Sequence, residues 1–259
     1  MKRIYLMVIS ILMILPSVGA RNESSTQVGI DERLGETIPL DLNFIDENGD
    51  TLSLADYIDK PTIVTLVYYN CPGICTPLLG EMTDLVDNMD LNPGVDYKIL
   101  TISFNHKDTP AIARTKKRNF LKGLRKPFPD DQWKWTTGDS LTIRKFTNAV
   151  GFNFMPDSSN FAHPTTLIVL SREAKITRYL YGIKQLPFDL KMAVIEASQG
   201  RVGPTISKVL QFCFSYDREG QKYAFNFTRV GGGFIILSLV IFMVSISLRT
   251  RKKQKVRGS

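Results

Sequence analysis

The sequence lacks the motifs of the large nucleotide-dependent enzyme classes. Its 259 residues contain no ATP-binding motif, no hydride-transfer motif, no internal repeat and no low-complexity block. Histidine and cysteine are scarce, with two and three residues respectively. Any metal or thiol site in this chain must therefore be built from very few side chains.

A charge excess is also missing from the central part of the chain. The formal net charge is +8, but the surplus cations lie at the two ends, including six within residues 249–257. Acidic and basic residues nearly balance in between, so the composition predicts no nucleic-acid partner.

The first twenty residues resemble an export signal. Lys2 and Arg3 precede an apolar run over residues 4–15, and residues 18–20 are small enough for cleavage. The alternative is an uncleaved anchor helix, but the run is short for a bilayer span. We therefore expect residues 1–20 to be a signal peptide.

A second apolar segment covers residues 230–248 and contains no charged residue. Its nineteen residues approach the roughly 20 that cross a bilayer. The basic residues 249–259 that follow are typical of a cytoplasmic tail. The alternative is a core helix followed by a nucleic-acid-binding arm. We expect a transmembrane helix in the inner membrane, with the soluble domain in the periplasm.

Between these ends the sequence predicts an α/β domain over residues 36–200. A flexible lead over 21–35 precedes it, and a helix (206–214) and linker within 201–229 follow. Apolar and turn patterns predict a hairpin over 42–54, strands at 62–69, 97–104, 133–137, 165–170 and 176–181, and helices at 78–89, 110–124, 140–150 and 187–198. This order predicts a thioredoxin-like fold with an N-terminal β-hairpin extension.

The strongest chemical signal follows the strand at 62–69. Cys71 and Cys75 flank Pro72-Gly73-Ile74, at the start of the next predicted helix. A helix that starts early would place both cysteines on one face, and its N-terminus favours thiolate. Two thiolates suit Cu(I). A structural disulfide remains the alternative.

His163 is the candidate third ligand. It lies in a loop just before the strand at 165–170, and such a loop packs beside the cysteine loop in a thioredoxin-like sheet. Sulfur and imidazole together hold both Cu(I) and Cu(II). We also expect a cis bond before Pro164. The alternative for His163 is an ordinary hydrogen-bonded loop residue, and His106 is interpreted as a surface histidine.

These motifs resemble the Sco/SenC family of copper chaperones over about residues 36–200. The similarity rests on residues 71–75, 103–110 and 137–138 and on the His163 loop. It implies that Cys71, Cys75 and His163 bind copper. It also implies delivery of copper to the dinuclear site of cytochrome c oxidase subunit II, or reduction of that site's cysteines. A copper donor or a thiol reductant would be a further partner.

Two features depart from the family pattern. Many members have Asp-Pro where this chain has Asn105-His106, which puts the role of that aspartate in doubt. Asp108 is interpreted as a loop or helix-capping residue. Many members carry an N-terminal anchor helix, whereas this chain is predicted to use a C-terminal one.

The remaining notable residues have ordinary interpretations. Cys213, between two phenylalanines, is predicted to pack as a small apolar residue. Trp133 and Trp135 are predicted to pack within a strand. A solvated helix face, or a docking surface for an acidic partner, explains the cations Arg114, Lys116, Lys117, Arg118, Lys122, Arg125 and Lys126.

Three rival functions are open. A thiol–disulfide oxidoreductase would use Cys71 and Cys75 without copper, although such reductants space their cysteines by two residues rather than three. A peroxiredoxin-type peroxidase needs threonine three residues before the reactive cysteine, where this chain has Tyr68. A structural membrane protein would hold only a disulfide. We predict a metallochaperone rather than an enzyme, with thiol exchange left open.

Overall fold

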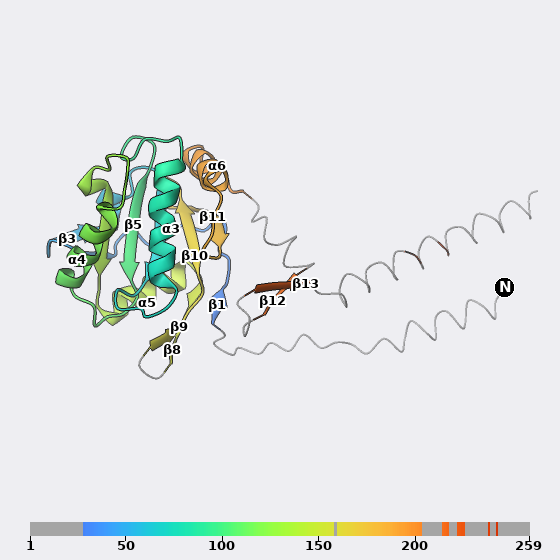
Figure 1. Cartoon of the computed structure of the whole chain (residues 1–259), viewed down its shortest axis with the longest axis horizontal. Helices are drawn as coiled ribbons and strands as arrows, with labels where there is room; N and C mark the ends of the chain where they lie inside the picture. The colour runs from blue at the N-terminus through green and yellow to red at the C-terminus, as the bar shows by residue number, and fades with distance from the viewer. Residues whose placement is uncertain are drawn as a thin grey trace, which may run out of the picture.

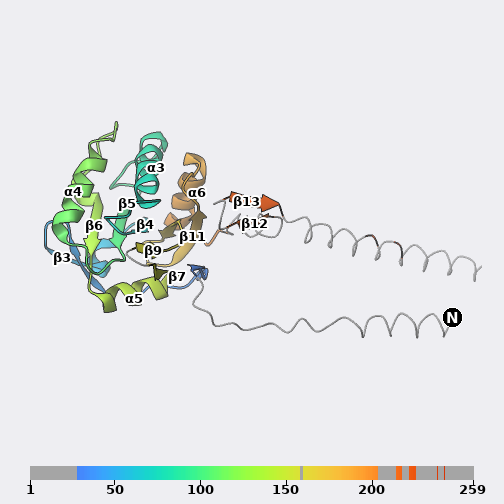
Figure 2. The same cartoon turned by 60° about the horizontal axis from the view of Figure 1, so that its bottom comes forward.

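The computed structural model describes residues 28–157, 160–203, 214–217 and 222–225, and the single positions 238 and 242. Its core is a seven-stranded sheet in the order β11-β10-β4-β5-β6-β2-β3. Helices α3, α4 and α6 lie side by side on one face of this sheet, and α5 covers the opposite face (Figures 1 and 2). This arrangement confirms the predicted thioredoxin-like α/β fold.

The centre of the sheet is parallel and its flanks are antiparallel. Strand β4 (Thr62–Val67) pairs parallel with β5 (Lys98–Ser103), which pairs parallel with β6 (Trp133–Thr137). β10 (Thr166–Leu170) runs antiparallel to both β4 and β11 (Ile176–Tyr181). Every residue of β4 and β5 is buried, as expected for strands covered on both faces. The chain therefore leaves β4 and β5 at the same edge of the sheet.

The hairpin and helices follow the expected pattern with small shifts. β2 (Asn43–Asp46) and β3 (Thr51–Ser53) pair antiparallel and extend the sheet beside β6, which confirms the predicted hairpin. The helices are α2 (Leu54–Tyr57), α3 (Cys75–Asn88), α4 (Pro110–Leu121), η1 (Asp130–Gln132), α5 (Ser140–Ala149) and α6 (Pro187–Ser198).

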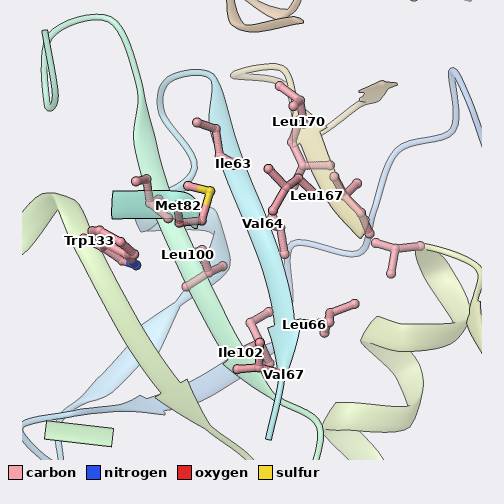
Figure 3. Close-up of a cluster of buried hydrophobic side chains, with 14 of the residues drawn as sticks. Ile63, Val64, Leu66, Val67, Met82, Leu100, Ile102, Trp133, Leu167 and Leu170 are labelled. Carbon is pink, nitrogen blue, oxygen red and sulfur yellow. The ribbon is translucent and has the colours of Figure 1, made fainter. Parts of the chain in front are cut away.

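The apolar core lies between the sheet and its helices. Figure 3 shows side chains of β4, β5 and β10 in one cluster, with Met82 of α3 and Trp133 of β6 beside them. Met82 and Trp133 are both fully buried. Burial of apolar area at about 25 cal/mol per Å² is the main force that holds these layers together. This core fixes the ends of β4 and β5 in place.

Two small pairings were not predicted. β1 (Gly29–Ile30) pairs antiparallel with β7 (Phe152–Asn153), so part of the expected flexible lead is attached to the domain. β8 (Met155–Asp157) pairs antiparallel with β9 (Asn160–Ala162), and together they form a short hairpin outside the main sheet (Figure 1). Residues 152–163 include β7, β8 and β9 and end at His163. We call this segment the His163 arm.

The predicted C-terminal transmembrane helix is not supported. In the part of the chain that the structure describes, no helix has the length and apolar character that a bilayer crossing needs. An apolar run does not by itself supply the roughly 20 consecutive helical residues of a span. Of residues 230–248 only Ser238 and Phe242 are described.

Several other predictions lie outside the described residues. These are the signal peptide over 1–20, the basic tail over 249–259 and Cys213. The predicted helix over 206–214 also lies outside them, except for Phe214. That residue begins β12 (Phe214–Asp217), which pairs antiparallel with β13 (Lys222–Phe225).

Candidate metal centre

The two cysteines lie where β4 gives way to α3. The chain turns after β4 through a hydrogen bond from the Cys71 backbone N–H to the Tyr68 carbonyl, at 3.2 Å. Helix α3 begins at Cys75, so Cys71 lies in the loop before it. The two cysteines therefore do not share a helical face, contrary to the early-start interpretation. Cys71 is half-buried and Cys75 is buried, and both are free thiols.

The His163 arm brings the imidazole to these sulfurs. The Nε2 atom of His163 lies 3.6 Å from the Sγ atom of Cys75. The ligand atoms of Cys71, Cys75 and His163 all lie within 4.8 Å of one another. Among the described residues, no other set of histidine, cysteine and acidic side chains is close enough to hold a metal ion. The predicted three-residue cluster is therefore brought together by the fold.

The other imidazole nitrogen fixes the orientation of the ring. Nδ1 of His163 lies 3.0 Å from the carbonyl oxygen of Pro164. A carbonyl oxygen only accepts hydrogen bonds, so Nδ1 carries the proton and Nε2 presents its lone pair toward Cys75. Burial lowers the pKa of His163 below its ordinary value, and the Pro164 carbonyl opposes this only in part. The ring is thus neutral at neutral pH, as a metal ligand must be.

The bond between His163 and Pro164 is trans, because the described residues contain no cis peptide bond. The cis prediction is therefore wrong. It relied on the analogous proline turn of thioredoxins, but here the residue before the proline is the histidine that faces the cysteines.

The pKa values of the two thiols are shifted in opposite directions. Burial alone would raise the pKa of Cys71, but hydrogen bonds outweigh it and hold that pKa below its ordinary value. The donors are the backbone N–H groups of Cys75 and Gly73, with the side chains of Cys75 and Tyr68. Burial raises the pKa of Cys75 far above its ordinary value, and the neighbouring Cys71 charge raises it further. In the metal-free site Cys71 therefore loses its proton more readily than Cys75.

Aromatic rings enclose the imidazole. The ring centroid of Phe104 lies 5.1 Å from that of His163, and the Tyr68 ring meets it edge to face at 5.8 Å. Two further rings lie close by. The ring centroid of Phe152 is 6.4 Å from that of His163, and the ring centroid of Phe161 is 5.2 Å from that of Tyr68. Phe104, Phe152 and Tyr68 are buried, so the inner side of the site is apolar, and an apolar surround strengthens the electrostatic interactions within it.

The buried carboxylate of Asp108 holds the loop after β4, which carries Cys71, against the loop after β5. Asp108 accepts hydrogen bonds from the Tyr69 backbone N–H at 2.7 Å, the Ser103 hydroxyl at 2.7 Å and the Asn105 side-chain amide at 3.0 Å. It therefore joins the loops that follow β4 and β5. Asp108 is a loop residue, as one of the two interpretations predicted. It does not cap α4, which begins after Thr109 without a side-chain cap.

The other candidates lie away from the cluster. His106 is exposed and contributes to no metal-ligand group among the described residues. Trp133 and Trp135 are fully buried, which confirms that they pack within the strand. The basic stretch is only partly solvated, because Lys117 is buried and forms an ion pair with Glu47 at 2.5 Å.

The sequence analysis missed the residues that surround the ligands. Tyr68 was interpreted only as the residue that stands where a peroxidase would have threonine. No role was predicted for the phenylalanines of the His163 arm. Phe152, Phe154 and Phe161 all lie shortly before the histidine in the sequence, and this is a signal that could have indicated an enclosed site.

Comparisons with known proteins agree with this geometry. The family model described as SCO1/SenC matches residues 31–190. The SCO1 protein homolog of Bacillus subtilis (strain 168) is 21% identical over 154 residues, covering 56% of this chain and 75% of the relative.

Two solved structures share the fold. A proposed electron transfer protein from Aquifex aeolicus VF5 is 26% identical with a TM-score of 0.59, covering 65% of this chain and 95% of the other. Arabidopsis thaliana ScoI, solved with copper bound, is 20% identical with a TM-score of 0.51 and covers 61% and 96% respectively.

Proposed function

The chain belongs to the SCO1/SenC family, and from this premise we propose that it binds one copper ion through Cys71, Cys75 and His163. The single observation that carries the proposal is the convergence of these three ligand atoms within 4.8 Å. The match of the SCO1/SenC family model to residues 31–190, a range that includes all three residues, supports the proposal.

The donor set fits copper. Two sulfurs are soft ligands that favour Cu(I), and the addition of an imidazole suits Cu(II) as well. Nε2 of His163 already faces the sulfur of Cys75 with a free lone pair, so no ring rotation is needed. Nδ1 is held by the Pro164 carbonyl, the type of outer contact that orients metal-binding histidines.

The asymmetry of the two thiols supports an order of ligation. Cys71 is less buried than Cys75 and loses its proton more readily, so it offers the first sulfur to an incoming ion. Cys75 is 2% exposed and holds its proton until the metal displaces it. Copper is cargo here, and a site with one accessible and one enclosed sulfur suits a protein that must both take up and release its ion.

We propose that the recipient is the dinuclear copper site of cytochrome c oxidase subunit II, in an extracytoplasmic compartment. The family membership and the expected export signal over residues 1–20 support this proposal. No ATP-binding or hydride-transfer motif is present, and transfer of copper between proteins needs neither.

Copper titration of the reduced protein tests the site. We expect one copper per chain, and with Cu(II) a thiolate charge-transfer band. Cys71→Ser or Cys75→Ser should abolish the band, and His163→Ala should weaken retention of Cu(II) more than that of Cu(I), because the thiolates dominate binding of the softer ion.

His106→Ala is the matched control, because His106 is exposed and outside the cluster. This variant should bind copper as the wild type does. Unchanged copper binding by Cys71→Ser would refute the site.

The same thiol asymmetry favours a second candidate function, the reduction of a partner's disulfide. Cys71, the less buried and more readily deprotonated of the two thiols, can attack the disulfide, and the buried thiol of Cys75 can resolve the mixed disulfide. Disulfide reduction that depends on Cys71 and Cys75 but is unaffected by His163→Ala would favour this activity. Absence of any reduction would leave copper binding as the function of the pair.

A further inference from the structure

Helix α4 and the loop after it carry a concentration of positive charge. Residues 109–129 contain seven lysines and arginines and no aspartate or glutamate. Like charges four residues apart on a helix repel one another and destabilise it. Helix α4 is the outermost helix of its layer and contacts β2 of the hairpin (Figures 1 and 2). The proposed copper site does not account for this charge.

Two of the seven cations are used within the fold. The ammonium of Lys117 is buried and forms ion pairs with the carboxylates of Glu47 and Asp130. The guanidinium of Arg125 forms an ion pair with the buried carboxylate of Asp87. These contacts hold α4 to the hairpin and to α3, so neither cation is free to bind a ligand.

Three exposed cations of this stretch have no carboxylate partner. Among the described residues, no ion pair involves Arg114, Arg118 or Lys122. Arg114 donates from Nε to the backbone carbonyl of Glu47 at 2.9 Å, which orients its guanidinium without neutralising it. The helix dipole favours Arg118 in the last turn, but it does not explain Arg114 in the second turn. An anion from outside the domain would relieve the repulsion among these three charges.

The three cations line one cleft between α4 and the turn of the β2–β3 hairpin. The cleft has a volume of about 350 Å³, which lies within the range of ligand-binding sites. Its lining holds four cations and only two carboxylates, and a concave surface with an excess of one charge attracts ions of the opposite sign. The lining is completed by Glu47, Asn48, Lys117, Leu121 and Asp130.

The spacing of the cations indicates the shape of the anion. Positions 114, 118 and 122 are four residues apart, so successive cations lie about 6 Å apart along the helix axis. Lys122 follows the last residue of α4 but keeps a helical φ of −63° and ψ of −22°. In an extended chain, alternate side chains point to the same side and lie about 6.6–6.8 Å apart. An extended segment with an acidic residue at every second position therefore matches this row of cations.

We propose that this cleft is a docking site for an extended acidic segment of a partner protein, which Arg114, Arg118 and Lys122 bind through its carboxylates. Guanidinium groups pair with carboxylates in a bidentate geometry, and an ammonium binds them as a point charge. A bilayer surface is flat, whereas these cations line a concave cleft that suits a narrow chain. The inference does not rest on copper binding, because no candidate copper ligand lines the cleft.

Fluorescence anisotropy with the full-length, copper-free protein tests the proposal. The probe is a labelled peptide in which three glutamates alternate with serines. We expect binding at low ionic strength that weakens as salt is added. The double variant Arg118→Gln/Lys122→Gln should weaken binding roughly fivefold at low salt, because two of the three charge pairs are lost. No binding of the peptide to the wild-type protein at low salt would overturn the proposal.

Arg144→Gln/Lys145→Gln is the matched control. These two residues are exposed on α5, on the opposite face of the sheet, and the double variant removes the same two residue types and the same charge. It should bind the peptide as the wild type does. Equal weakening by the two double variants would show that only net charge matters, and would overturn the docking site.

Two further probes test the nature of the ligand. A peptide of the same composition with its three glutamates consecutive should bind several-fold more weakly, and equal binding would overturn the extended arrangement. Vesicles of anionic phospholipid and inorganic phosphate are the other anions to compare. If either binds in a manner that requires Arg118 and Lys122 while the alternating peptide does not bind, the cleft serves that anion and the proposed protein partner is wrong.

Discussion

Glu47 and Lys117 face each other inside the protein, with side chains only 3% and 4% exposed. Glu47 also accepts the Trp135 backbone N–H at 3.0 Å, and Lys117 donates to the backbone carbonyl of Asp130. The pair thereby joins the β2–β3 hairpin to α4 and β6. A charged pair that is this buried is stable only while both partners are present.

Removal of the Glu47 charge is therefore expected to destabilise the fold. Glu47→Gln leaves the ammonium of Lys117 without its main partner and should lower the free energy of unfolding by about 3 kcal/mol. Urea denaturation measures this loss. Lys122→Gln, at an exposed position just after the same helix, should change it by less than about 0.5 kcal/mol. Equal stability of the two variants would contradict the argument.

At the residue scale, the sequence allowed the three candidate ligands that converge in the structure to be singled out, but not their surroundings. Cys71, Cys75 and His163 are chemically distinctive and scarce, so few combinations were available. The Tyr68 ring beside His163 and the Lys117 ammonium beside Glu47 depend instead on which neighbours the folded chain supplies. Tyrosine and lysine are common, and nothing local in the sequence marks these two as buried.

At the scale of elements, β1 and β7 attach the start of the domain to the His163 arm. Gly151 makes the attachment possible. Its φ is +64°, a conformation that glycine adopts without strain, and a Cβ atom there would lie 1.8 Å from the Asp31 carbonyl oxygen. The Asp31 backbone N–H donates to the Gly151 carbonyl at 2.8 Å, so the two backbones touch directly.

Gly151→Ala should detach β1 from β7. Gly200→Ala is the matched control, since Gly200 has φ +63° but no atom within 4 Å of the added carbon. Both variants incur a left-handed backbone strain of roughly 1–2 kcal/mol. Only Gly151→Ala should also speed amide hydrogen exchange at Gly29 and Ile30. Slow exchange there in Gly151→Ala would contradict the steric argument.

Element prediction succeeded where the local pattern is strong. The fully buried and mainly apolar β4 and β5, and the Asn48-Gly49 turn of the hairpin, lie close to their predicted positions, and Gly49 has the positive φ that such turns use. β8 and β9 have three residues each, with a proline in β8, and show no clear alternation. Such short pairings form only because the flanking chain is already held, so sequence patterns do not reveal them.

At the scale of the whole molecule, the proposed copper site exists only when the domain is folded. Cys71 lies in a loop, Cys75 begins α3 and His163 follows β9, so the core between them sets their spacing. A metal that binds the folded state alone stabilises it by mass action.

Copper is therefore expected to stabilise the reduced protein globally. At a free Cu(I) concentration 100 times the dissociation constant, the free energy of unfolding should rise by about 2.7 kcal/mol. Denaturation with and without a Cu(I) chelator measures this. Cys75→Ser should lose most of the increase, and an equal increase in that variant would show that copper stabilises the protein from elsewhere.

The separation of the ligands along the chain also affects biosynthesis. Cys75 and His163 are 88 residues apart. At ribosomal elongation rates of about 5–20 residues per second, the imidazole is added roughly 4–18 s after the second thiol. During that interval the nascent chain carries two neighbouring thiols without their third partner. All three candidate ligands therefore become available to one copper ion only after translation has passed residue 163.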